Sequence, residues 1–128
     1  MIQIRLILRM TAQLIALFNL SLVLPLVISF VFQDQYYHVF FQAIAINFTI
    51  AILLYFPLRH CHGEFRNLDA YLLVTMCWVS IIVISAIPFL LSEFFQSPMD
   101  ALFEATSGIT TTGVEVIKDL SALPPSLL

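Results

Sequence analysis

Charged residues are scarce in this sequence. Only 10% of its 128 residues are Asp, Glu, Lys or Arg, whereas 61% are hydrophobic and the mean hydropathy is +1.01. Soluble domains contain about 25% charged residues, so the composition excludes a soluble globular domain with a solvated surface. The high hydrophobicity also excludes intrinsic disorder. Five basic against eight acidic residues give a net charge of −3, so the chain has no basic surface for nucleic acid. A multi-pass membrane protein remains.

Motifs that carry catalysis are missing as well. The sequence contains no H-E-x-x-H, no G-x-S-x-G and no Walker A pattern, so we expect no enzyme activity and no cofactor. Its two cysteines, Cys61 and Cys77, lie too far apart in a chain too poor in cysteine for a disulfide framework.

Three long apolar stretches predict an all-α membrane protein. They run from about Met10 to Phe32, from Val39 to Leu58 and from Ala70 to Leu91, and none contains an acidic or basic residue. Each reaches the roughly 20 residues that a transmembrane helix needs. The first stretch is too long, and lacks the small residues at its end, for a cleaved signal peptide, so we expect it to be a retained span.

The basic residues predict the orientation of these spans. Arg5 and Arg9 precede the first span, and Arg59 and Arg66 lie between the second and the third. Basic residues concentrate on the cytoplasmic side of membrane proteins, so the amino terminus is expected in the cytoplasm. Polar residues within the spans are expected to bridge helices rather than to bind a substrate; they are Asn19, Gln42, Asn47 and Thr49.

A short helix is predicted after the third span. Ser97 is a good N-cap, Pro98 suits the first helical position, and Asp100 completes a capping-box-like pair. Apolar residues then recur on one helical face at Met99, Leu102, Phe103 and Thr106, and Gly108 is predicted to end the helix. About ten residues span roughly 15 Å, half the hydrocarbon thickness of a membrane, so this helix cannot cross.

The residues that follow the short helix predict an extended segment. Thr110, Thr111 and Thr112 favour extended backbone, and Gly113 allows conformations that other residues resist. A half-helix followed by such a segment is the arrangement of a cation filter, in which backbone carbonyls replace the hydration shell of an ion. An amphipathic helix followed by a polar loop explains the same residues equally well.

A family resemblance favours the filter. The string Ser107-Gly108-Ile109-Thr110-Thr111-Thr112-Gly113, preceded by Asp100-Ala101-Leu102-Phe103-Glu104-Ala105, resembles the first pore loop of the Trk/Ktr/HKT potassium transporters, closest to the bacterial TrkH branch. The stretch from Tyr71 to Phe89 is similar to the first M1 helix of that family, the first two spans to its amino-terminal hairpin, and residues 120–125 to the link toward M2.

The resemblance implies a fold of four M1–pore-loop–M2 repeats around one pathway in the bacterial inner membrane. Thr110, Thr111, Thr112 and Gly113 would then offer carbonyls to K⁺, as one of four filter strands. Residues 1–66 would form the amino-terminal hairpin and cytoplasmic loop, and residues 67–128 the first pore-repeat segment, with M2 absent from this amino-terminal fragment. A homodimer and a cytosolic TrkA-type nucleotide-binding subunit are the implied partners.

Four further residues are expected to serve the filter. Glu104, Ser107 and Gly108 are expected to support the loop, with the Glu104 carboxylate bonded to its backbone amides. Glu115 follows the filter glycine where the family usually has a small or hydroxyl residue, and is expected at the outer mouth. The alternative is a small, non-transporting membrane assembly or interaction protein with an incidental Thr-Gly loop.

Overall fold

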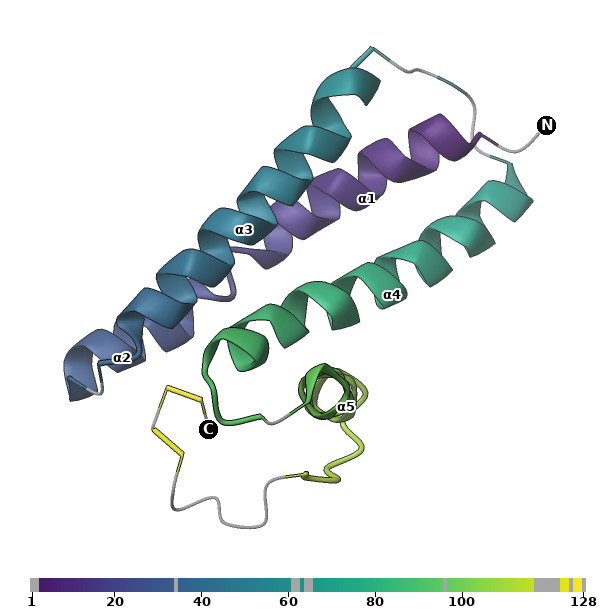
Figure 1. Cartoon of the computed structure of the whole chain (residues 1–128). Coiled ribbons are helices and arrows are strands. Elements are labelled where there is room, and N and C mark those ends of the chain that lie inside the picture. Colours follow the sequence, from purple (N-terminus) through teal and green to yellow (C-terminus); the bar gives the residue numbers. More distant parts are fainter. Residues whose placement is uncertain are drawn as a thin grey trace.

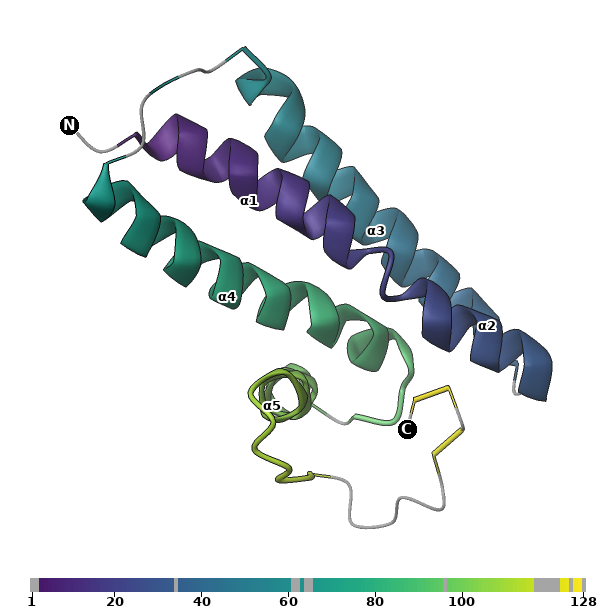
Figure 2. The same cartoon turned by 180° about the vertical axis from the view of Figure 1, so that it is seen from behind.

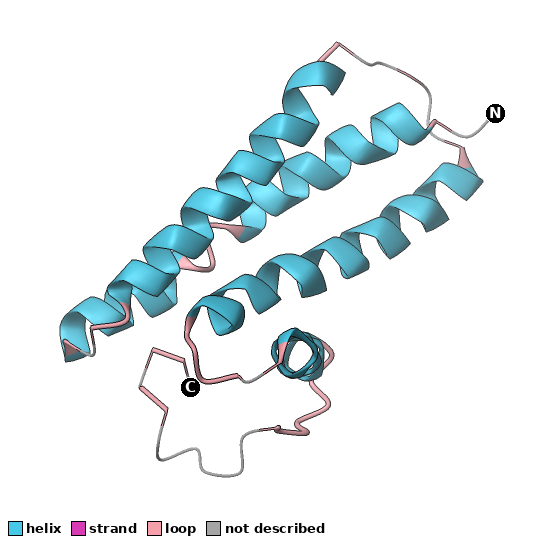
Figure 3. Ribbon diagram, viewed as in Figure 1, coloured by secondary structure: helices cyan, strands magenta, loops and turns pink. Residues whose placement is uncertain are grey.

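Helices make up all the regular structure in the part of the chain that the computed structural model describes (Figure 3). The described residues are 3–33, 35–60, 63, 66–95, 97–116, 123–124 and 126–127. The elements are α1 (Ile4–Phe18), α2 (Val23–Phe32), α3 (Tyr37–Tyr55), the 3-10 helix η1 (Phe56–Leu58), α4 (Asn67–Leu91) and α5 (Pro98–Ile109). The prediction of an all-α protein is confirmed.

Three helices pack together and two others extend this bundle. α1 lies against both α3 and α4, which also contact each other, and α2 continues along α3 (Figures 1 and 2). The apolar contact among the three packed helices is centred on the buried side chains of Ile15, Ala51 and Ile84, one from each helix. α5 packs only against α4 among the described helices, with its axis steeply inclined to the α4 axis (Figure 1).

The three predicted spans are confirmed. The segments Ile4–Phe32, Tyr37–Leu58 and Asn67–Leu91 contain 29, 22 and 25 residues, and an 18-residue stretch of each has a mean hydropathy of 2.5, 2.1 and 2.4 respectively. At about 1.5 Å per residue, even the shortest of them exceeds the roughly 30 Å hydrocarbon core of a bilayer. The chain is therefore a multi-pass membrane protein.

The first span differs from the prediction because it begins earlier and is broken. It starts at Ile4, and residues 19–22 form turns between α1 and α2. Pro25 has no amide hydrogen, so the Ser21 carbonyl cannot accept the usual α-helical bond from it; this carbonyl instead accepts from the Leu24 amide at 3.2 Å. The Ser21 hydroxyl also donates to the Phe18 carbonyl at 2.7 Å, so side chain and proline together interrupt the helical ladder.

Two of the predicted bridging residues do join helices. The Asn19 side-chain amide donates to the Ile44 carbonyl of α3 at 3.3 Å, and that of Asn47 donates to the Ile84 carbonyl of α4 at 3.4 Å. Thr49 differs from the prediction, since its hydroxyl donates at 2.7 Å to Ala45 within its own helix. Gln42 is exposed on α3.

A buried carboxylate joins the beginnings of α1 and α4. Asp69, 1% exposed, accepts from the Arg66 amide at 3.2 Å, which caps α4, and from the Gln3 amide at 3.0 Å, which precedes α1. Both bonds satisfy amides that a helix start leaves without an internal acceptor. This contact holds the first helix against the helix that leads toward α5.

Candidate functional site

The candidate site is built on α5 and the loop that follows it. Ser97 is the N-cap as predicted, with its hydroxyl oxygen accepting from the Met99 amide at 3.1 Å, and Pro98 opens the helix. Asp100 lies in the first turn, where a negative charge faces the positive end of the helix dipole. The helix has 12 residues and so measures about 18 Å, too short to cross a membrane.

The packed face of α5 is made of small residues. Ala101 and Ala105 are 0% and 3% exposed, and their size lets α5 approach α4 closely. The larger residues of the predicted apolar face point elsewhere, since Met99 is 73% exposed and Phe103 is 49% exposed. That face is open in this chain to a bilayer or to another segment.

The end of α5 lies beyond the predicted stop. Gly108 is within the helix, which runs to Ile109 and is capped by Thr110. The Thr112 amide donates to the Ser107 carbonyl at 2.9 Å and the Thr111 amide to the Gly108 carbonyl at 3.1 Å, the two bonds of a Schellman motif. This motif needs a left-handed residue immediately after the cap, and here Thr111 occupies that position.

The backbone of Thr111 is strained. Its φ is +55°, a region that glycine enters freely but that costs an ordinary residue about 1–2 kcal/mol. A β-branched side chain there is rarer still. The expectation of extended backbone from Thr110 onward is therefore wrong for the first two threonines, which form the turn; Thr112 to Glu115 lie outside helix and turn.

Two side chains of α5 accept hydrogen bonds from backbone amides of the loop that follows the helix. The Ser107 hydroxyl oxygen accepts from the Val114 amide at 2.9 Å, and the Glu104 carboxylate accepts from the Val116 amide at 2.9 Å. These bonds attach the second half of the non-helical stretch to one helix through two side chains three residues apart, on the face that i and i+3 positions share. Glu104 and Ser107 thus make the kind of contact expected of residues that support the loop.

The hydroxyls of Thr110 and Thr112 are hydrogen-bonded. Thr110 Oγ1 donates to the Thr106 carbonyl at 2.7 Å and lies 2.7 Å from Thr112 Oγ1. In contrast, the carbonyls of residues 110–113 accept no hydrogen bond from any described residue, and all four residues are exposed. The amides of Thr110, Thr111 and Thr112 and two of the three threonine hydroxyls are therefore bonded, whereas the four carbonyl oxygens have no partner among the described residues.

Gly113 and Glu115 complete the segment. Gly113 has a φ of +70°, so it adopts a left-handed conformation that other residues resist, as expected for this glycine. Both residues line a hollow of about 220 Å³, together with Glu104, Ser107, Gly108, Thr111 and Val114. The structure brings together every predicted filter, support and mouth residue in this one hollow or directly beside it. The predicted link toward M2 lies mostly outside the described residues, as does Cys61.

The sequence predicted that Glu104 bonds backbone amides of the loop, but it did not indicate that of Val116, and it missed the bond between the Val114 amide and Ser107. A backbone amide leaves no mark on residue type, so only the spacing of two acceptors on one face of α5 could have indicated them. The left-handed conformation of Thr111 could not be predicted either, because the intrinsic propensity of a run of threonines favours extended backbone.

Comparisons with known proteins bear on the whole chain. Residues 36–128 match the family model TrkH, described as cation transport protein. The chain is 36% identical over 126 residues to the Trk system potassium uptake protein TrkH of Halomonas elongata and 35% identical over 126 residues to the Trk system potassium uptake protein TrkG of Escherichia coli (strain K12). Each match covers 98% of this chain and 26% of the relative.

A solved structure shows the same arrangement. The crystal structure of the potassium transporter TrkH from Vibrio parahaemolyticus matches with a TM-score of 0.91 and 29% identity, over 98% of this chain and 27% of that one. The chain thus spans about a quarter of the length of the relatives it matches.

Proposed function

Because the chain belongs to the TrkH family of cation transport proteins, we propose that it supplies one of four selectivity-filter strands of a potassium uptake transporter. The relatives carry the name potassium uptake protein, which supports K⁺ as the transported ion. They are transporters rather than enzymes, and the proposed activity needs no cofactor.

The observation that carries this proposal is that the carbonyls of residues 110–113 accept no hydrogen bond from the residues that the structure describes. A dehydrated K⁺ needs several oxygen ligands to replace its water, and backbone carbonyls supply them without adding net charge. The amides of the three threonines and the hydroxyls of Thr110 and Thr112 are bonded to other groups, which helps the segment to keep its shape while its carbonyls bind a cation.

The short helix adds to the attraction of a cation. Its carbonyl end, the negative pole of the helix dipole, lies at the beginning of the segment. Glu104 and Glu115 both line the hollow beside the segment. In the proposed filter, Glu115 lies at the outer mouth. A cation entering from the mouth thus meets Glu115 first and the carbonyls afterwards.

One strand encloses no pathway, so the proposal requires further strands. We expect four such repeats around one central path, with residues 1–66 as an amino-terminal hairpin and residues 67–128 as the first pore-repeat segment. We further propose that the spans lie in the inner membrane of a bacterium with the amino terminus in the cytoplasm, an orientation that the arginines at positions 5, 9, 59 and 66 support. A homodimer and a TrkA-type regulatory subunit complete the proposed assembly.

A chimera tests the proposal. Residues 3–127 replace the matching segment of the Halomonas elongata relative, and the chimera is expressed in a host that lacks its own K⁺ uptake systems. We expect growth at low external K⁺ and uptake of the K⁺ tracer Rb⁺. A chimera that reaches the membrane yet supports neither would favour the non-transporting alternative, an assembly or interaction protein.

A further inference from the structure

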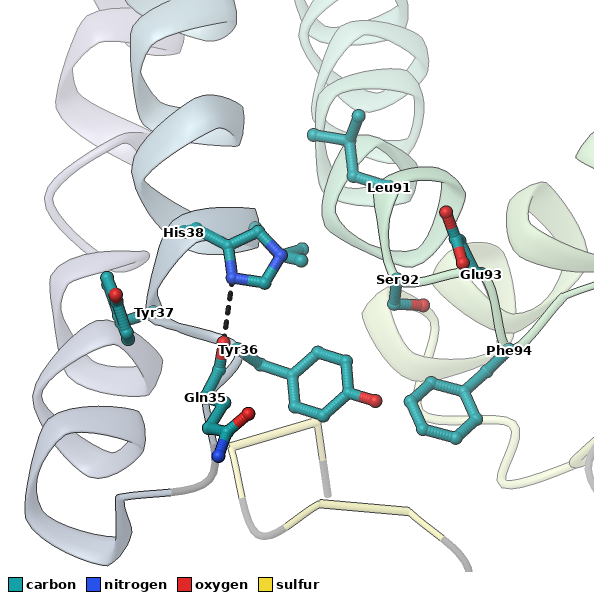
Figure 4. A pocket seen from close by; sticks show the side chains of 9 residues that line it. Gln35, Tyr36, Tyr37, His38, Leu91, Ser92, Glu93 and Phe94 are labelled. Atoms are coloured by element: carbon teal, nitrogen blue, oxygen red, sulfur yellow. Dashed lines mark hydrogen bonds between the residues drawn. The ribbon is translucent and has the colours of Figure 1, made fainter.

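A second cavity lies away from the candidate filter, between the beginning of α3 and the end of α4. Its volume is about 620 Å³, and its lining includes Tyr36, His38, Ser92, Glu93 and Phe94. Figure 4 shows the His38 ring and the Glu93 side chain on opposite walls, with Tyr36 reaching across toward Phe94. The Tyr36 and Phe94 rings are 5.5 Å apart between centroids, so they close one side of the cavity.

An apolar groove adjoins this cavity. It has a volume of about 560 Å³ and lies between α2 and α3, lined by Leu26, Val27, Phe30, Val31 and Phe41. Tyr37 and His38 line both spaces, so the groove and the cavity are neighbours on either side of these two residues. α2 and α3 belong to membrane-length spans, and Phe30 and Val31 are 78% and 69% exposed, so in a bilayer this groove faces hydrocarbon chains.

The two walls of the cavity differ in charge. Among the described residues that line it, Glu93 is the one acidic residue and none is a lysine or an arginine. On the opposite wall, His38 Nδ1 bonds the Gln35 carbonyl at 2.7 Å, which turns the other ring nitrogen away from the backbone. α3 begins at this wall, so the positive end of its dipole lies there. One wall therefore favours a cation and the other an anion.

We propose that the groove and the cavity together bind one phospholipid with an ethanolamine head group. One acyl chain lies in the groove beside Val27 and Phe30. The phosphate lies near Tyr37 and His38, and the ammonium group donates hydrogen bonds to Glu93. This lipid is zwitterionic, and its two head-group charges match the two walls. The assignment depends on membrane insertion and not on the proposed transport of K⁺.

The carboxylate sets the preference among lipids. A primary ammonium donates hydrogen bonds to Glu93, whereas the quaternary ammonium of choline has no N–H to donate. A phosphatidylglycerol head group brings only a negative charge, which Glu93 repels. The expected order of affinity is ethanolamine above choline and choline above glycerol.

Native mass spectrometry of the full chain tests this order. The chain is released from mixed micelles that contain equal amounts of phosphatidylethanolamine, phosphatidylcholine and phosphatidylglycerol with identical acyl chains. Because exposed ion pairs are weak, we expect the ethanolamine lipid to be retained about threefold over the choline lipid. Glu93→Gln lowers this ratio to about one, and Glu93→Asp keeps it above one. Asp100→Asn, which removes a charge on α5 away from both spaces, leaves it unchanged.

A second pair of variants tests the groove. Val27→Trp fills the groove and lowers retention of the ethanolamine lipid, whereas Val83→Trp, at a similarly exposed position of α4, does not. Equal retention of the three lipids by the unaltered chain, or an unchanged ratio in Glu93→Gln, would show a nonspecific lipid shell and overturn the assignment. No ion flux enters these measurements, so their result is independent of the transport proposal.

Discussion

Single residues carry the unusual conformations of the candidate filter. Thr111 and Gly113 both have positive φ, at +55° and +70°, and only the second is a glycine. Strain of this kind persists where surrounding bonds over-determine the backbone, and it gathers at functional sites. Here the bonds at Thr112, Val114 and Val116 supply that constraint.

Relieving the strain at Thr111 is expected to stabilise the chain. Thr111→Gly removes the left-handed penalty, so the free energy of unfolding in mixed micelles should rise by about 1 kcal/mol. Thr75→Gly in the middle of α4 is the matched control, and it should destabilise because glycine weakens a helix interior. A loss of stability in Thr111→Gly would contradict the left-handed assignment.

At the scale of elements, α5 and its loop act as one unit. The loop has little contact of its own, and its amides are held by acceptors on the helix. Each neutral hydrogen bond contributes about 0.5–1.5 kcal/mol net, and a bond to a charged group about 1.5–3 kcal/mol before solvent exposure reduces it. A small change on α5 therefore alters the shape of the loop.

Hydrogen exchange at single amides tests this dependence. Ser107→Ala should speed exchange at the Val114 amide, and Glu104→Ala should speed it at the Val116 amide, because each variant removes the acceptor. Glu104→Gln keeps an acceptor oxygen and should restore much of the protection at Val116. Unchanged exchange rates in both alanine variants would mean that these side chains do not hold the loop.

The contact between α3 and α4 gives a second prediction at this scale. Asn47→Ala removes the bond to the Ile84 carbonyl and should lower the free energy of unfolding by about 0.6–1.7 kcal/mol, the range for such bonds in membrane proteins. Thr49→Ala, whose bond stays within α3, should change it much less. Equal effects of the two variants would argue against a bridging role for Asn47.

For the whole molecule, composition and hydropathy are enough to predict the fold class. Three charge-free stretches must satisfy their backbone in lipid, and helices do this within each segment. The short helix was predictable because Ser97 and Pro98 mark its start by local chemistry. The resemblance of the Thr-Gly string located the candidate filter.

Other features depend on contacts that no local pattern contains. The break at residues 19–22 is stabilised by Asn19 reaching the Ile44 carbonyl, 25 residues away. α5 ends at Ile109 and not before Gly108 as predicted, because the carbonyls of Ser107 and Gly108 accept the two bonds of a Schellman motif in which a threonine is the left-handed residue. Propensity assigns such positions to glycine, and only the assembled hydrogen bonds decide otherwise.

Residues 110–113 are proposed to form a K⁺ filter strand, and a substitution of Gly113 is the sharpest test of that role. In the chimera with the Halomonas elongata relative, Gly113→Ser introduces a side chain at a φ of +70°, which disturbs the carbonyls on either side. We expect the ratio of Rb⁺ to Na⁺ uptake to fall by about tenfold, which corresponds to about 1.4 kcal/mol of lost discrimination. Ala70→Ser, which adds the same hydroxyl at an exposed position of α4, should leave the ratio unchanged. An unchanged ratio in Gly113→Ser, with normal transport, would contradict the filter assignment.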